Sequence, residues 1–449
     1  MFTRFLSISL VIVAALITSC QDELEKELVK NPAHESSSVV SREQMTVTTS
    51  ARTSITSTCT VVDPYPGNDE LYLICVPENW NGELILYAHG YVGAHVPDLT
   101  FAEGEQYAGL VTSLQFAYAT TTYSANGLHI QQGIEEMLAL KDYAVNYLEA
   151  NYSSPSYVYL AGASQGGAIT ALTLERNPDA FSGGFSLCGP CGHFEKQLNY
   201  YGDFRVIFDY YFKSLVKPTL TALGLPYPDN LDNIPLLLIN NWETVYVPII
   251  LQALQNYPQL TNKLMSVSKA PFDSNDVTTI GQTVISTLWY NFFTTDDAKL
   301  KIKGVLFDNT KRLYFGTGSF LEDLKLNKEI KRVVVKSDNG TYPMHLYETT
   351  GDLNTPMMME HTTKDPIQLF LLHQPVYRLK VLAAGKSFNF AAIPIFRYGH
   401  CNFTEGEILQ GLAGLILKVK GQELFAQSLL DGMLNADNFI LSVEKKIMN

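Results

Sequence analysis

The fold is decided by the stretch Tyr157-Val158-Tyr159-Leu160-Ala161-Gly162-Ala163-Ser164-Gln165-Gly166-Gly167. Residues 157–160 are a short apolar run typical of a buried strand, and residues 165–176 favour a helix. Between them lies the pattern G-x-S-x-G, whose glycines leave room for a sharp turn from strand to helix. Such a turn lifts the serine hydroxyl out of the sheet, above a helix N-terminus whose amides favour negative charge. The pattern predicts that Ser164 is a nucleophile; the alternative is a serine in an ordinary glycine-rich turn.

Strand and helix patterns alternate on both sides of this turn. That alternation predicts an α/β fold with a mostly parallel sheet flanked by helices. Residues 192–335 interrupt it with aromatic and leucine-rich helical patterns, which predict a helical insertion after the sixth strand. The core is therefore expected in residues 57–191 and 336–449. The remaining predicted strands are 59–62, 71–76, 84–88, 115–121, 181–187, 344–348 and 390–395, with helices at 130–151 and 405–418.

A serine hydroxyl is a poor nucleophile until a base takes its proton, so a histidine is required. Of the nine histidines, His400 stands just after the last predicted strand and before the final helix. This position favours His400 as the base. His361 and His373 are also downstream of the serine, and His193 lies at the start of the insertion; all three are weaker candidates.

The histidine must in turn be oriented by a carboxylate, which follows the serine and precedes the histidine in the chain. Asp352 lies in the loop after the strand predicted at residues 344–348, and we expect it to be this acid. Its glycine and proline neighbours would equally suit an aspartate in a turn. Asp338 and Asp365 are the alternatives.

An oxyanion formed by attack of the serine needs two amide donors. The first is expected to be the backbone N–H of Gln165, directly after the serine. The second is expected from the loop after His89-Gly90, at Tyr91. Tyr123 and, in the insertion, Trp242 are candidate substrate-binding residues; core packing is the alternative for the insertion's aromatic side chains.

These motifs together resemble an α/β-hydrolase-fold serine esterase or peptidase. The resemblance spans about residues 70–190 and 340–420, is specific for the superfamily and says little about a substrate. It implies that the insertion is a cap covering the active site and contributing to substrate choice. It rests on Asn79-Trp80-Asn81-Gly82 leading into Ala88-His89-Gly90-Tyr91, the segment 121–127, the turn at Ser164, Gly351-Asp352 and Gly399-His400-Cys401.

The first residues, MFTRFLSISLVIVAALITSC, have a basic residue followed by an apolar run shorter than the roughly 20 residues of a membrane span. The segment ending in Cys20 resembles the lipobox of bacterial lipoproteins, which implies that Cys20 is lipidated. Residues 1–19 would then be a signal peptide and the polar residues 20–56 a tether. An ordinary signal peptide is the alternative. We expect an exported lipoprotein of the cell envelope, held at a membrane by this anchor.

Five further cysteines follow Cys20, so at least one has no partner within the chain. Cys59 and Cys75 lie on adjacent predicted strands and are expected to pair in an exported protein. Cys401 adjoins His400 and is expected to pair with Cys188 or Cys191. Cys188-Gly-Pro-Cys191 also has the C-x-x-C form of a redox motif, but it lacks the strand-to-helix context that such chemistry needs.

The chain has 449 residues, of which 46% are hydrophobic and 17% charged, and its net charge is −13. This composition excludes a largely disordered chain and a coiled coil, and without a basic block it argues against a nucleic-acid binder. No metal-binding pattern and no cofactor motif is seen. We expect a serine hydrolase that cleaves a small carboxylic ester. The alternatives are a serine peptidase or aminopeptidase of the same fold, and a non-catalytic binding lipoprotein.

Overall fold

The computed structural model describes residues 45–47, 57–65, 69–229, 235–302, 307–334 and 344–421. The predicted signal peptide, the lipidation site at Cys20, most of the tether and the alternative acid Asp338 lie outside these residues. Within them, no helix combines the length and the apolar character needed to cross a membrane.

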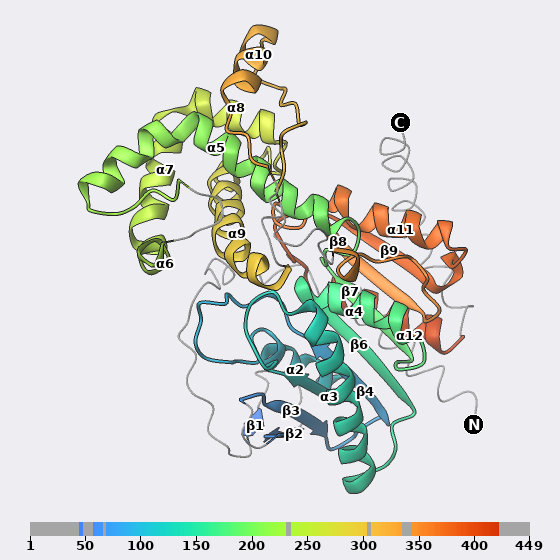
Figure 1. The fold of residues 1–449 in the computed structure, drawn as a ribbon. Coiled ribbons are helices and arrows are strands. Elements are labelled where there is room, and N and C mark those ends of the chain that lie inside the picture. Colours follow the sequence, from blue (N-terminus) through green and yellow to red (C-terminus); the bar gives the residue numbers. More distant parts are fainter. Residues whose placement is uncertain are drawn as a thin grey trace.

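The centre of the molecule is a nine-stranded sheet in the order β1-β2-β3-β5-β4-β6-β7-β8-β9 (Figure 1). The strands from β5 to β9 in this order are parallel, whereas β1, β2 and β3 pair antiparallel at one edge. The predicted mostly parallel sheet is confirmed. The strands are β1 Met45–Val47, β2 Ser57–Val62, β3 Tyr72–Pro77, β4 Glu83–Ala88, β5 Ala117–Thr121, β6 Tyr157–Ala163, β7 Gly183–Leu187, β8 Met357–Lys364 and β9 Phe390–Tyr398.

Helices cover both faces of the sheet. On one face, α3 (Ile130–Asn151), α4 (Gln165–Arg176) and α11 (Gln374–Ala383) pack into the larger core. On the other, α2 (Gly104–Ser113) and α12 (Glu405–Val419) pack against a second apolar cluster. A strand covered on both faces is expected to be mostly apolar, and β4 is buried along its whole length. This double burial explains why the sequence shows β4 as a continuous apolar run.

The segment between β7 and β8 is helical and has an aromatic core of its own. Figure 1 shows its helices gathered at one end of the molecule, beyond the sheet. They lie where the sequence predicts a helical insertion, which we call the insertion below. Its helices are α5 Phe194–Ala222, α6 Leu236–Asn241, the π-helical turn Trp242–Tyr246, α7 Val247–Asn256, α8 Pro258–Ser268, α9 Thr278–Ile302 and α10 Phe320–Glu329.

The strand predicted at residues 344–348 is wrong. Residues Met344–Leu346 form one turn of 3-10 helix, and the strand of this region is β8, Met357–Lys364. The sequence of β8 is MMMEHTTK, in which Glu360 and His361 are fully buried although both side chains are polar. The sequence therefore lacks the apolar run that normally reveals a buried strand.

Candidate active site

The turn from β6 to α4 places Ser164 in a strained backbone conformation, with φ 54° and ψ −120°. The Ser164 amide donates to the carbonyl of Leu187 at the end of β7 (2.9 Å), which fixes the turn to the neighbouring strand. The flanking glycines are required for space. A Cβ atom on Gly166 would lie 1.8 Å from the carbonyl oxygen of Ala88, and one on Gly162 would lie 2.4 Å from that of Gly166. The turn therefore has the form that the G-x-S-x-G pattern predicts.

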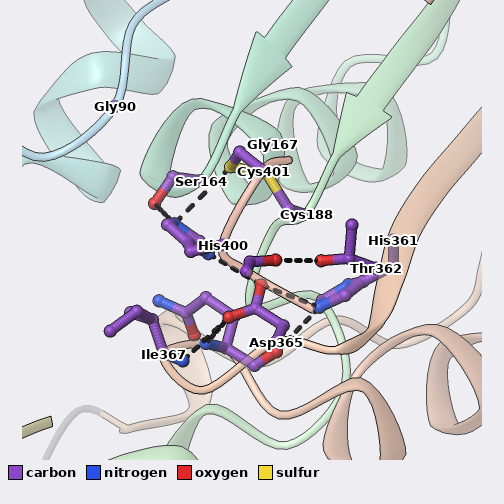
Figure 2. The surroundings of a disulfide bond; sticks show 12 residues. Gly90, Ser164, Gly167, Cys188, His361, Thr362, Asp365, Ile367, His400 and Cys401 are labelled. Carbon is purple, nitrogen blue, oxygen red and sulfur yellow. Dashed lines mark hydrogen bonds and ion pairs between the residues drawn. A yellow bond between two sulfur atoms is a disulfide. The ribbon is translucent and has the colours of Figure 1, made fainter. Parts of the chain in front are cut away.

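His400 lies directly after β9 with its imidazole against the serine (Figure 2). Its Nε2 atom is 2.9 Å from Ser164 Oγ, so the neutral ring can accept the hydroxyl proton. The two residues are 236 positions apart in the sequence. The structure thus brings the predicted nucleophile and the predicted base together.

The carboxylate on His400 is that of Asp365, in the loop after β8. His400 Nδ1 lies 2.7 Å from Asp365 Oδ2. The other oxygen, Oδ1, accepts from the amides of Ile367 (2.8 Å) and Gln368 (2.9 Å), which holds the carboxylate in place. Burial of Asp365 disfavours its charged form, but the neighbouring His400 and His361 outweigh this effect and lower the pKa of the carboxyl group to about 2. Asp365 is therefore a charged, fixed partner for the imidazole.

These three side chains follow β6, β8 and β9, in the order serine, acid, histidine. A mostly parallel sheet with a serine on a sharp strand-to-helix turn, followed by an acid and then a histidine, is typical of one architecture. The chain has the α/β-hydrolase fold. The predicted fold class is confirmed. The insertion lies between β7, the strand after Ser164, and β8, the strand before Asp365.

No protein-family model matches the chain, and no curated protein sequence matches it. Among solved structures, the chain is similar to feruloyl esterase B from Aspergillus oryzae, with 13% identity and a TM-score of 0.41 over 82% of this chain and 81% of that one. It is also similar to an esterase from Aspergillus oryzae, with 11% identity and a TM-score of 0.42 over 82% and 80% of the two chains. Proline iminopeptidase from Mycobacterium smegmatis shares 12% identity, with a TM-score of 0.38 over 82% and 100%. The assignment of the α/β-hydrolase fold rests on the sheet and the turn at Ser164.

The prediction of Asp352 as the orienting acid requires correction. The Asp352 side chain is 64% exposed, and its carboxylate faces Lys386 at 3.4 Å, away from His400. The error follows from the missed strand. The prediction places the acid after a strand at residues 344–348, whereas the strand is β8 and the residue that follows it is Asp365. Asp365 is one of the two alternatives that the sequence leaves open.

The other candidate histidines lie near the acid loop or at the start of the insertion. His361 on β8 is fully buried, with Nε2 2.7 Å from the carbonyl oxygen of Gln368 and 3.5 Å from Asp365 Oδ2. His373 is also buried, and its Nε2 atom lies 2.8 Å from Gln197 Oε1 in α5. His193 stands just before α5. Among the described histidines, His400 is the one whose ring lies within hydrogen-bond distance of Ser164 Oγ.

Tyr91 and Gln165, the predicted oxyanion residues, both line a cavity that also contains Ser164. The side chain of Gln165 is turned into the scaffold, where it accepts from the amide of His129 (2.9 Å). The loop bearing Tyr91 is held by Glu103, whose Oε1 atom accepts from the amide of Gly90 (2.6 Å). No sequence pattern identifies Glu103, which stands directly before α2 and 13 positions after Gly90.

The cavity has a volume of about 50 Å³ and lies between the sheet and the insertion, since α5 and α9 both contribute to its wall. Among the described residues that line it, none is charged. Tyr290 of α9 closes the side next to the base, with its ring edge-on to that of His400 at 6.5 Å. Besides Ser164, Gln165, Tyr91 and Tyr290, the wall consists of Leu128, Ile130, Pro190, Phe194, Gln197, Leu198, Tyr201, Thr294, Ala298 and Gln368.

The two predicted substrate-binding residues are not part of this wall. Tyr123 is buried in the core, where its ring lies between those of His89 (4.0 Å) and His129 (5.2 Å). Trp242 packs inside the insertion against Phe292 (5.4 Å). Both aromatic residues stabilise the scaffold, so their assignment to the pocket is corrected.

Two disulfides join four of the five cysteines that follow Cys20. Cys59 pairs with Cys75 between β2 and β3, and Cys188 pairs with Cys401 beside His400 (Figure 2). Cys191 is a buried thiol, and burial raises its pKa to about 12. The C-x-x-C motif is therefore not a dithiol pair. Cys188, Cys401 and His400 lie close enough to share a metal ion, but both sulfur atoms are committed to the disulfide.

Proposed function

We propose that the chain is a serine hydrolase that cleaves a carboxylic ester through Ser164, His400 and Asp365. The observation that carries this proposal is the continuous line of contacts from Ser164 Oγ to His400 Nε2 (2.9 Å) and from His400 Nδ1 to Asp365 Oδ2 (2.7 Å). A serine on a strained turn, a histidine within hydrogen-bond reach and a buried carboxylate are the groups that acyl transfer requires.

In this proposal His400 Nε2 takes the hydroxyl proton while Ser164 Oγ attacks the acyl carbon. The protonated imidazole is stabilised by Asp365, and it then gives the proton to the departing alkoxide, which leaves as the alcohol. His400 then takes a proton from a water molecule that attacks the acyl-serine, and it returns this proton to Ser164 Oγ as the acid leaves. The backbone N–H groups of Gln165 and Tyr91 are proposed to stabilise the oxyanion in both halves.

An ester is favoured over the substrate of an aminopeptidase by the chemistry of the cavity wall. An aminopeptidase must hold a free, protonated amine, for which a carboxylate in the wall is the usual partner. The cavity-lining residues that the structure describes include no aspartate and no glutamate. The wall suits an uncharged group beside the reacting carbonyl.

The test is a screen of 4-nitrophenyl esters and aminoacyl-anilides with the wild type and Ser164→Ala. We expect ester hydrolysis that Ser164→Ala abolishes, together with covalent labelling of Ser164 by a fluorophosphonate. Hydrolysis of anilides alone would assign the chain to the peptidases. If no substrate is cleaved and Ser164 is not labelled, the remaining interpretation is a non-catalytic binding protein.

We further propose that the protein is an exported lipoprotein anchored to a membrane through Cys20, with the insertion as a cap over the active site. The two disulfides support an oxidising compartment, because such bonds are rare where thiols are kept reduced. Metabolic labelling with a radioactive fatty acid checks the anchor. Label is expected on the wild type and not on Cys20→Ala; equal labelling of the two would contradict this proposal.

A further inference from the structure

Gln368 presents an unsatisfied amide in the wall of the cavity. The residue is 7% exposed, and its Oε1 atom, although buried, accepts no hydrogen bond from any described residue. The backbone of Gln368 is fixed, because its backbone N–H donates to Asp365 Oδ1 (2.9 Å) and its backbone carbonyl oxygen lies 2.7 Å from His361 Nε2. Buried polar groups are nearly always paired, so an unpaired amide oxygen on a residue of the same cavity wall as Ser164 is a group that a ligand can complete.

Two other polar side chains of the wall, those of Gln197 and Tyr201, are already occupied. Gln197 Nε2 donates to the carbonyl of Ile367 (2.6 Å), and its Oε1 atom accepts from the amide of Leu369 (3.0 Å). The hydroxyl of Tyr201 also donates to the carbonyl of Ile367 (3.1 Å). These groups hold the chain after Asp365, whereas the side-chain oxygen of Gln368 has no hydrogen-bond partner among the described residues.

The volume of the cavity limits the size of the substrate group that can bind in it. An apolar cavity of about 150 Å³ is large enough for benzene. The cavity beside Ser164 has about 50 Å³, enough for a few non-hydrogen atoms and too small for an aromatic ring. Its uncharged wall disfavours an ionised group, which would lose its hydration without gaining a counter-charge.

We propose that Gln368 selects esters of short-chain hydroxy acids, by pairing its side-chain amide with a hydroxyl of the acyl group. A hydroxyl both donates and accepts, so it can pair with the amide in either orientation of its oxygen and nitrogen. We assign this hydroxyl to the acyl group of the ester, because the acyl group stays bonded to Ser164 after the alcohol leaves. This inference rests on the proposed ester hydrolysis and adds the class of acyl group.

The test compares two esters with the same leaving group and the same carbon chain, 4-nitrophenyl butyrate and 4-nitrophenyl 3-hydroxybutyrate. The wild type is expected to show a kcat/KM at least about 5-fold higher for the hydroxy ester, the effect of one hydrogen bond. In Gln368→Met, which keeps the length of the side chain and removes the amide, this ratio should fall to about one.

Gln374→Met is the matched control. Gln374 is likewise buried and has an unpaired Oε1 atom, but it lies outside the cavity wall. It should keep the wild-type ratio. Hydrolysis of both esters by the wild type with no preference, or a preference that survives in Gln368→Met, overturns the role of Gln368 and leaves the proposed ester hydrolysis standing. If neither these esters nor the wider ester panel is hydrolysed, the proposed function itself fails.

Discussion

At the scale of single residues, Asp365 shows how an aspartate stays charged in the interior. Its two oxygens are taken up by two backbone amides and by His400, with His361 close to the same oxygen as His400. Asp352 has none of these partners and faces solvent and Lys386. The two aspartates are thus chemically alike and differ in what surrounds them, which makes them a matched pair for mutation.

Asp365→Asn should lower kcat by roughly 10⁴-fold, because an amide neither stabilises the protonated imidazole nor fixes its tautomer. Asp352→Asn should leave kcat within about 2-fold of wild type, since removing one exposed ion pair changes little. Ester hydrolysis measured under saturating substrate checks both variants. A large loss in Asp352→Asn with none in Asp365→Asn would reverse the assignment.

Glu360, on β8, is a buried carboxyl group without a hydrogen-bond partner among the described residues. Burial, followed by the negative charge of Glu407, raises its pKa well above 4.5. Below about pH 4.5, Glu360 holds its proton in both the folded and the unfolded chain. As the pH rises, the unfolded chain releases the proton and the folded chain keeps it, so the free energy of unfolding decreases.

Glu360→Gln stays neutral at every pH, so its melting temperature should rise relative to wild type as the pH increases above about 4.5. Thermal unfolding followed by circular dichroism at a series of pH values measures this difference. A difference that does not change with pH would mean that Glu360 titrates alike in the folded and unfolded chains.

At the scale of elements, the sequence predicts most of the sheet and fails at β8. The strands around Ser164 are apolar runs ended by glycine or proline, and those patterns locate β4, β6 and β7 correctly. β8 instead carries Glu360 and His361 inward, and pairing with β7 and β9 stabilises it despite that composition. Ser164 and His400 follow from local patterns, whereas Asp365 depends on this strand. The cavity wall depends on packing between elements and has no local pattern.

The insertion is attached to the loop that follows β8. From α5, Gln197 bonds to Ile367 and Leu369, and the hydroxyl of Tyr200 donates to the carbonyl of Pro366 (3.0 Å). These contacts lie directly beside Asp365, so the position of α5 and the position of the carboxylate are linked. We infer that the insertion supports the acid as well as enclosing the cavity.

Gln197→Leu removes two hydrogen bonds from this loop and should lower kcat by about 10-fold or more, because each bond is worth about 1 kcal/mol. Lys196→Ala, an exposed change on the same helix, is the control and should have no effect on kcat. Steady-state kinetics, which gives kcat and KM for each variant, is the measurement. A rise in KM with unchanged kcat would mean that Gln197 contacts substrate without positioning Asp365.

At the scale of the whole molecule, the proposed catalytic residues come from parts of the chain on either side of the insertion. Ser164 precedes it, and Asp365 and His400 follow it. The Cys188–Cys401 disulfide connects the same two parts across a separation of 213 residues, whereas Cys59 and Cys75 are 16 residues apart. The long-range bond therefore restricts the unfolded chain far more than the local one.

Chain entropy predicts a loss of about 5 kcal/mol in the free energy of unfolding for Cys188→Ser/Cys401→Ser, against about 3 kcal/mol for Cys59→Ser/Cys75→Ser. Urea unfolding of the two double variants measures the difference. Equal losses, or a larger loss for the local pair, would show that chain entropy does not govern the contribution of these bonds.

The Cys188–Cys401 bond also closes a covalent ring that contains every residue of the insertion. A protease that cuts the insertion once opens this ring but frees no fragment, because the two pieces remain joined through sulfur next to His400. Nicked molecules therefore keep Ser164 and His400 on one covalent unit, and the insertion can be cleaved without dispersing the groups that it separates in sequence.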